Sequence, residues 1–211
     1  ERNGDIVFKS QYDVTILEQG IQLGGCLQCF VRKGAKFETG MHFIGSALPG
    51  QTMDRMFNFL DINDQIKLSA LDEDAYNTVS LAGSRFTFPN GRESFLNRMS
   101  SYFPEEKDAL NKYVEIIDRI SAASSLNSLT SVGRDLAANT EFQLRTINDV
   151  LDELFTDEML KNVLVGDLSL YSAEYDKTPF SQHAFIMDFY NQSAFRIAGG
   201  SDSIAFALIN N

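Results

Sequence analysis

The spacing of polar and apolar positions changes several times along the chain, and each spacing predicts a different element. Near the amino terminus, the alternating run Val14-Thr15-Ile16-Leu17 ends at one acid, Glu18. This alternation predicts a strand over residues 13–18 with the acid at its carboxyl end. Two short extended pieces, 27–32 and 36–38, are expected around a turn at residues 33–34.

Apolar residues then recur at helical spacing. Residues 50–60 predict a helix with one apolar face, formed by Met53, Met56, Phe57 and Leu60, which we interpret as a core face. Further helices are predicted over 90–103, 104–120, 147–155, 157–165, 179–192 and 201–209. We expect Asn90, together with Glu93, to cap the helix over 90–103, and Thr156 to cap the helix over 157–165.

Between these helical stretches the apolar residues alternate with period two. Residues 66–70, 78–81 and 85–88 read as short strands, and a turn at residues 82–84 joins the last two into a hairpin. The change of period near residue 63 marks a domain boundary. We therefore expect an α/β or α+β architecture in two parts, one of which is a small antiparallel sheet covered by helices.

Composition excludes several functional classes. The chain has 211 residues, 44% of them hydrophobic and 22% charged, which is ordinary for a globular protein. Its net charge of −11 and pI of about 4.6 argue against binding nucleic acid, which needs a basic surface. The same charge disfavours docking on anionic membranes through charge alone. No run of apolar residues is long enough for a membrane-spanning helix.

Two cysteines, Cys26 and Cys29, form a lone C-x-x-C. A zinc site would need two more ligands, and the chain offers only His42 and His183. If residues 26–30 are extended, the two thiols point to opposite faces and no disulfide forms between them. We expect reduced thiols without function, no metal site, and a cytoplasmic or membrane-peripheral location.

The segment from Glu18 to Gly25 carries the chemistry. An acid that ends a strand can accept hydrogen bonds from the hydroxyls of a ribose, and glycines let backbone approach a ligand closely. The alternative is a solvated acid followed by a plain tight turn. Both readings stay open on these residues alone.

The pattern Glu18-x5-Gly24-Gly25, followed by FETGMHFIG at 37–45, resembles the FAD-binding region of the phytoene desaturase, carotenoid isomerase and retinol saturase family. Members of this family are flavin oxidoreductases that act on long polyenes. The resemblance continues through FPNGR at 88–92, YFPE at 102–105 and AGGS at 198–201, and therefore covers most of the chain in order.

The resemblance implies a role for each matched residue. Glu18 would bind a ribose, Gly24 and Gly25 would lie beside the adenosine or the pyrophosphate, and residues 39–42 would approach the flavin. The expected cofactor-binding residues are Glu18, Gly24, Gly25, Thr39, Gly40 and His42. No catalytic residue is assigned, because in flavin chemistry the electrons are carried by the cofactor. His183 is interpreted as a core residue.

Family members are much longer and begin with a strand and a G-x-G-x-x-G turn, and that motif occurs nowhere in this sequence. We therefore expect residues 1–62 to be a partial FAD-binding domain, residues 63–195 a substrate domain, and residues 196–211 a helix that returns to the first. The expected cofactor is FAD in a full-length parent, without tight retention by this chain.

The resulting hypothesis is a part of an FAD-dependent desaturase, saturase or isomerase of a hydrophobic polyene or isoprenoid, inactive alone. The alternative is a non-enzymatic module that has lost flavin and binds a lipid-like ligand. The 17 phenylalanines and 6 methionines suit an apolar pocket and an ordinary core equally well. An exposed sheet edge is also expected to favour self-association.

Overall fold

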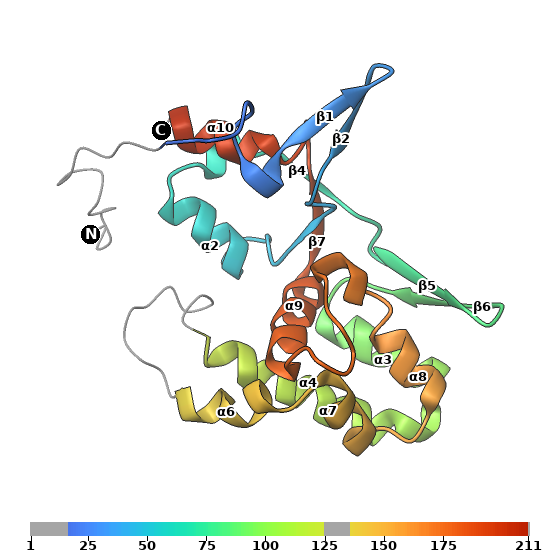
Figure 1. The fold of residues 1–211 in the computed structure, drawn as a ribbon. Helices are drawn as coiled ribbons and strands as arrows, with labels where there is room; N and C mark the ends of the chain where they lie inside the picture. Colours follow the sequence, from blue (N-terminus) through green and yellow to red (C-terminus); the bar gives the residue numbers. More distant parts are fainter. Residues whose placement is uncertain (1–16, 125–135, 211) are drawn as a thin grey trace. The chain divides into compact units, whose positions relative to one another are not determined.

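The structure is a computed structural model that describes residues 17–124 and 136–210. The chain divides into two compact units (Figure 1). The first unit comes from the residues up to Ala70 together with those from Phe195 onwards, and the second unit is Leu71–Ala194.

Short strands form most of the first unit. After a 3-10 turn, η1 (Gly25–Leu27), the strands β1 (Cys29–Arg32) and β2 (Ala35–Glu38) pair as an antiparallel hairpin in which Phe30 faces Phe37. A second sheet has the order β3-β7-β4, from β3 (Ile44–Gly45), β7 (Ala194–Ile197) and β4 (Leu68–Ala70). β4 and β7 are antiparallel, so residues far apart in sequence close this unit.

Two helices and a 3-10 turn complete the first unit: α2 (Thr52–Phe59), η2 (Asn63–Gln65) and α10 (Asp202–Asn210). Phe57 is buried, and Met53 and Leu60 pack against the same core, so the predicted apolar face of this helix is confirmed as a core face. The buried core of the first unit consists of Ile44, Ala47, Phe57, Ile62, Ile66, Ile197, Ile204 and Ala207.

The second unit is mostly helical. It begins with the antiparallel hairpin of β5 (Asn77–Leu81) and β6 (Ser84–Phe88). Its helical elements, in order, are α3 (Arg92–Tyr102), η3 (Pro104–Glu106), α4 (Lys107–Ala122), α6 (Leu136–Leu144), α7 (Ile147–Leu154), α8 (Glu158–Leu164), η4 (Leu168–Tyr171) and α9 (Phe180–Gln192).

The core of the second unit lies between α4 and α9, which run side by side in Figure 1. The apolar stripe predicted for the first of them is confirmed, since all its members are buried: Leu110, Tyr113, Val114, Ile117 and Ile120. The Tyr113 ring contacts both Phe155 and Phe180, at centroid distances of 5.8 and 6.2 Å. Burial of such a stripe is the main stabilising contribution for helices of this length.

The architecture is mixed, with small antiparallel sheets and helices, as predicted. The two expected caps are wrong. Gly91, not Asn90, precedes α3, and its φ of 90° gives the sharp turn into the helix without a side-chain cap. Asp157, not Thr156, caps α8 by accepting a hydrogen bond from Leu160 N at 3.0 Å.

Other differences concern elements with weak patterns. Pro104–Glu106 forms a separate 3-10 turn instead of the first turn of α4. Cys26 lies in η1, so the extended backbone expected there is wrong. β7 and α6 were not predicted. Residues 13–16 of the strand predicted over 13–18 lie outside the part of the chain that the structure describes. Its last two residues, Leu17 and Glu18, have irregular backbone.

Candidate functional site

Three glycine-containing segments of the first unit make close backbone contacts with neighbouring elements. The first is Gly24-Gly25, where Gly24 has φ of 106° and Gly25 has φ of 52°. A Cβ at Gly24 would lie 3.3 Å from the Cβ of Ala205 in α10, whereas one at Gly25 would meet nothing within 4 Å. The first glycine therefore allows close packing on the helix, and the second borders open space.

The second segment is Thr39-Gly40. Thr39 donates twice to the carbonyl of Gln28, from its N–H at 3.1 Å and from its Oγ1 at 2.9 Å. A Cβ at Gly40 would lie only 3.0 Å from the carbonyl oxygen of Cys26. These contacts hold residues 39–40 directly against the segment that follows the first glycine pair.

The third segment is Gly199-Gly200, which leads from β7 into α10. Gly200 has φ of 107°, and a Cβ there would lie 2.9 Å from both Cys29 Sγ and Lys36 Cε. Ser201 Oγ donates to the carbonyl of Leu27 at 2.9 Å. Gly200 thus meets the hairpin of β1 and β2 through backbone that leaves no space for a side chain.

A pocket of about 410 Å³ opens beside this second glycine pair. Two ion pairs border it. Lys36 Nζ lies 2.7 Å from Asp202 Oδ1, and Arg196 lies 2.6 Å from Glu38 Oε2. The hydrogen bond to Asp202 raises the pKa of Lys36 above its ordinary value. Because each cation is matched by an acid, the pocket has no excess charge from these four side chains.

The remaining predicted site residues lie apart from these contacts. Glu18 is exposed, and its Oε1 accepts a hydrogen bond from the N–H of Gly20 at 2.6 Å. His42 is exposed just after the Thr39-Gly40 segment. The structure therefore brings together Gly24, Thr39 and Gly40, while Gly25, Glu18 and His42 border solvent.

Cys26 is an exposed free thiol and Cys29 a buried one. The Sγ of Cys29 lies 3.6 Å from Ser201 Oγ, so this cysteine is part of the contact between hairpin and helix. Among residues 17–124 and 136–210, no group of three or more His, Cys, Asp or Glu side chains could hold a metal ion. Over the same residues, no helix is both long and apolar enough to cross a membrane.

His183, in the second unit, is a core residue. Its Nε2 and Nδ1 lie 2.8 Å from the hydroxyls of Tyr113 and Tyr171, and the ring is fully buried. Burial lowers the pKa of His183 to about 3, because the charged imidazolium would lose its hydration. A neutral histidine bound by two tyrosines fills the core, so His183 is a core residue as the sequence predicted.

The first unit has two features that suit a nucleotide ligand, an exposed carboxylate and open space beside a glycine. A carboxylate has acceptor capacity for several hydrogen bonds, so the exposed Glu18 can bind hydroxyl groups in addition to the Gly20 N–H. The open space at Gly25 would let backbone approach a ribose or a phosphate. These residues can hold and orient a cofactor, whereas the chemistry of electron transfer would be supplied by the flavin itself.

Comparison with known families agrees with this placement. Residues 8–60 match the NAD(P)-binding Rossmann-like domain family. The matched range contains Glu18, both residues of the first glycine pair, and Thr39 to His42. Over these residues the chain is therefore similar to a Rossmann-like dinucleotide-binding domain.

The chain as a whole is similar to all-trans-retinol 13,14-reductases. It is 30% identical to the protein of that name from Rattus norvegicus and 26% identical to that from Homo sapiens, in each case over 97% of this chain and 36% of the relative. Identity to the Danio rerio protein is 24% over 93% of this chain. The chain thus spans about a third of the length of these relatives, and the resemblance to the retinol saturase family is confirmed.

Sequence reasoning missed the ion pairs that border the pocket. Lys36 and Glu38 alternate on β2 and therefore share one face, which was a readable signal. Their partners flank the second glycine pair. Arg196, which pairs with Glu38, is 158 positions away in the sequence, and Asp202, which pairs with Lys36, is 166 positions away. No local pattern links such distant residues.

Proposed function

We propose that the chain is part of an FAD-dependent oxidoreductase that acts on a hydrophobic polyene or isoprenoid. The observation that carries this proposal is the close packing of Gly24 on Ala205 and of Gly40 on Cys26, at two glycines of the segment that matches a Rossmann-like family. Similarity to retinol reductases along nearly the whole chain supports the substrate class. Desaturation, saturation and isomerisation are all compatible with it.

The proposal assigns one role to each cofactor-binding residue. Glu18 accepts hydrogen bonds from the ribose of the adenosine, and Gly24 and Gly25 lie beside the adenosine or the pyrophosphate. Thr39, Gly40 and His42 lie towards the flavin. The first unit then holds the cofactor, and the mostly helical second unit holds the substrate.

The role of Glu18 can be tested with a matched pair of ligands. FAD contains the adenosine ribose, whereas FMN lacks the entire adenosine half. Glu18→Gln is expected to weaken FAD binding by about 10- to 100-fold, as for the loss of a hydrogen bond to a charged group. The same substitution should leave FMN binding unchanged. Glu73→Gln, an exposed glutamate of the second unit, is the control.

Equal losses for FAD and FMN would contradict the ribose assignment, and so would an unchanged affinity for FAD. A visible spectrum separates the enzymatic proposal from the alternative of a module without flavin. Bound flavin absorbs at about 450 nm. Free FAD absorbs there too, so the band is compared across an equilibrium-dialysis membrane. A protein that binds apolar ligands but shows no excess of this band on its own side at any FAD concentration would favour the alternative.

We further propose that these 211 residues do not hold FAD tightly or act alone. The sequence has no G-x-G-x-x-G turn, whose N–H groups normally bind the phosphates. Losing two such hydrogen bonds costs about 3–6 kcal/mol, which weakens binding by about a hundred-fold to ten-thousand-fold. Calorimetric titration is the test, and submicromolar binding of FAD would contradict this proposal.

Self-association is also proposed, because the first unit exposes large apolar side chains. Ile21 and Ile209 are examples, with relative exposures of 110% and 55%. Exposed apolar surface favours contact between copies. Light scattering should show a mass that rises with concentration, and a strictly monomeric protein at high concentration would contradict the proposal.

The free thiols Cys26 and Cys29 support the expected cytoplasmic or membrane-peripheral location.

A further inference from the structure

The hairpin of β1 and β2 has two different faces. Side chains alternate along each strand, so Cys29 and Lys36 lie on the face that contacts α10, through Ser201 and Asp202. Phe30 and Phe37 lie directly opposite each other on the other face. Their rings stack at a centroid distance of 5.3 Å and an angle of 19°. They remain 48% and 46% exposed, so the stacked pair is available to a partner.

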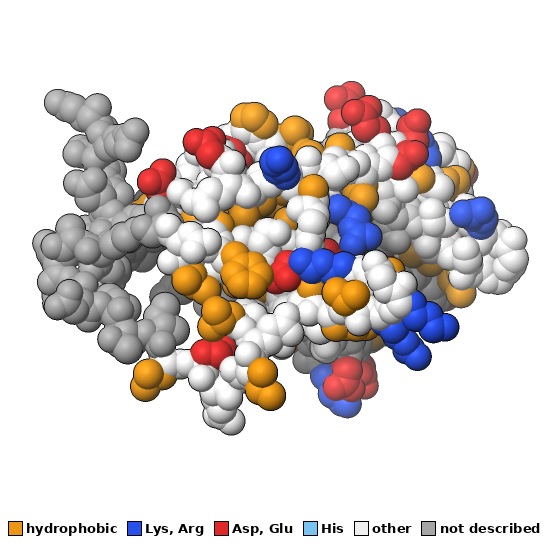
Figure 2. Space-filling model, turned by 90° about the horizontal axis from the view of Figure 1, so that it is seen from above, with side chains coloured by type: hydrophobic (Ala, Val, Ile, Leu, Met, Phe, Trp, Pro, Cys, Tyr) orange, Lys and Arg blue, Asp and Glu red, His pale blue; other side chains and the backbone are white. Residues whose placement is uncertain are grey.

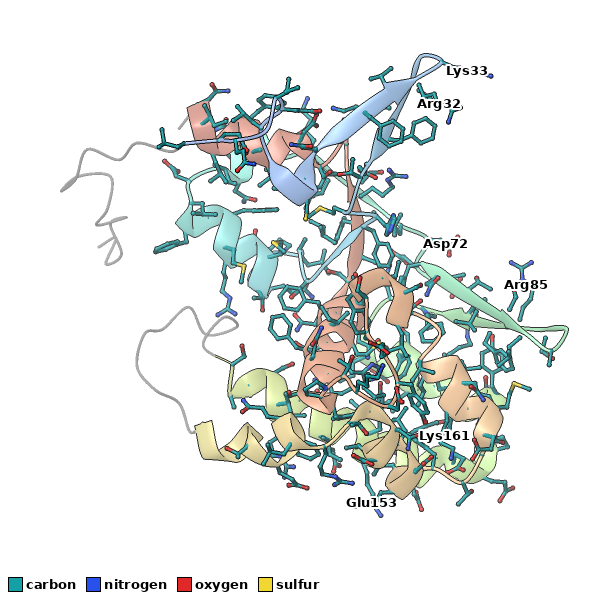
Figure 3. The ribbon with its side chains drawn as sticks, viewed as in Figure 1. Arg32, Lys33, Asp72, Arg85, Glu153 and Lys161 are labelled. Atoms are coloured by element: carbon teal, nitrogen blue, oxygen red, sulfur yellow. The ribbon has the colours of Figure 1, made fainter. Side chains whose placement is uncertain are left out.

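The turn of the same hairpin is basic. Figure 3 shows Arg32 and Lys33 at its tip, and neither forms an ion pair with another described residue. Val31, beside them, is 69% exposed. Residues 29–37 contain three cations and no acid, although the chain as a whole has a net charge of −11. Lys36 is paired with Asp202, so the positive charge available to a partner comes from Arg32 and Lys33. Figure 2 shows hydrophobic and basic side chains close to one another on the face it presents.

We propose that this hairpin docks the protein on an anionic lipid surface. Aromatic side chains are stabilised in the interfacial region of a bilayer, and neighbouring lysine and arginine side chains bind anionic headgroups. The hairpin supplies both at one tip. The rest of the acidic chain is repelled by such a surface, so docking depends on these residues and requires anionic lipid. This inference names a surface for the membrane-peripheral location proposed above, and it does not depend on the flavin or substrate assignments.

Charge complementarity favours a lipid surface over a second copy of the chain. A symmetric contact between two copies through the stacked phenylalanines would also bring the two Arg32 side chains together, since Arg32 lies on the same face. Like charges in such a contact are destabilising. An anionic bilayer instead neutralises these cations while it buries the rings.

The sequence contains no tryptophan, so Phe30→Trp introduces a single fluorescent reporter. Its emission should shift to shorter wavelength with vesicles of phosphatidylcholine containing about 30% phosphatidylserine, and should be quenched by brominated lipid in those vesicles. Pure phosphatidylcholine vesicles should produce no shift. Raising the salt concentration should weaken binding, because headgroup attraction is screened.

The double substitution Arg32→Gln/Lys33→Gln, in the Phe30→Trp background, should weaken binding to the anionic vesicles by about 10- to 30-fold. The matched control is Lys67→Gln/Arg85→Gln, which removes two exposed cations elsewhere and should leave binding unchanged. Circular dichroism should be the same for both variants, because all four side chains are exposed.

Three outcomes would overturn the proposal. The first is no emission shift with anionic vesicles. The second is an equal loss of binding in the control variant, which would indicate a general charge effect. The third is an emission shift that rises with protein concentration in the absence of lipid, which would show that a second copy covers the hairpin.

Discussion

The two units of the molecule differ in how well they bury their own apolar side chains. In the second unit, Tyr113, Phe155 and Phe180 are almost completely inaccessible to solvent. In the first unit, Leu17 and Ile21 are exposed by 91% and 110%. Among the large hydrophobic residues that are exposed in the described part of the chain, only Leu144 belongs to the second unit.

The difference follows from the elements. Helices of the second unit place continuous apolar stripes against one another, so local sequence is enough to build a core. The strands of the first unit are two to four residues long, and its hairpin of β1 and β2 has one open face. We infer that the second unit is stabilised mainly by its own packing, whereas the first unit has surface that suits ligands and partners.

The largest expected effect tests the packed core. Phe180 is fully buried against Phe142, Tyr113 and His183. Phe180→Ala should lower the free energy of unfolding by about 3–5 kcal/mol, because it leaves a cavity. Phe59→Ala, at a residue of the first unit that is 50% exposed, should cost less than about 1 kcal/mol. Urea unfolding measures both, and equal losses would remove the contrast between the units.

The next effect concerns pH. The pKa of His183 is lowered by burial to about 3 in the folded chain, and is about 6.5 when unfolded. The unfolded state therefore binds the proton more readily. The stability that depends on neutral His183 is complete above pH 6.5 and is lost as the pH falls towards 3. At pH 5 the loss should be about 2 kcal/mol.

His183→Gln provides the comparison for this measurement. It removes the titrating ring but keeps the buried acids Asp167 and Asp188, whose pKa values are raised by burial. Urea midpoints between pH 8 and pH 5 should fall more steeply for the wild-type chain than for the variant. Parallel pH profiles would show that His183 is not held neutral by burial.

A smaller effect tests the first unit. Gly24→Ala forces a side chain into backbone with φ of 106° and towards Ala205, and should cost about 1–3 kcal/mol. Gly34→Ala is the control, because Gly34 also has a positive φ, of 79°, but a Cβ there would meet nothing within 4 Å. Thermal unfolding distinguishes the two variants. If both substitutions were equally mild, the close approach of the glycine pair to α10 would have no energetic importance.

The smallest effect concerns the ion pair of Lys36 with Asp202. Its side-chain exposures of 40% and 10% indicate partial screening, so Lys36→Met should cost at most about 1 kcal/mol. The cost should shrink at high salt. Lys33→Met, at a residue without an ion pair to a described residue, should change stability by less than about 0.5 kcal/mol. A salt-independent loss at Lys36 would point to packing instead of charge.

The sequence was most informative where periodicity is strong. The stripe from Leu110 to Ile120 predicted a buried helix face, and alternation predicted the hairpin at residues 77–88. β7 was missed because four residues between an aromatic helix and a glycine pair give too short a pattern. The caps were missed because Asn90 and Thr156 are one residue away from the true helix starts, which tertiary contacts decide.

The candidate site shows the same limit. The family resemblance selected Gly24, Gly25, Thr39 and Gly40 as candidates, and of these Gly24 and Gly25 have the positive φ that favours glycine. The resemblance did not indicate that Gly40 packs on Cys26 or that α10 packs on Gly24, because those contacts join segments distant in sequence. The long-range pairing of β4 with β7 brings α10 to the site, and it depends on the whole unit.

Amide hydrogen exchange with and without FAD tests the central claim, that the cofactor site lies in the first unit and the second unit is stable by itself. Without FAD, amides of α4 and α9 should be the most protected. About 1 mM FAD should slow exchange in residues 18–29 and 39–42 and leave 71–124 and 136–194 unchanged. Slower exchange confined to the second unit, or no change anywhere, would contradict the account.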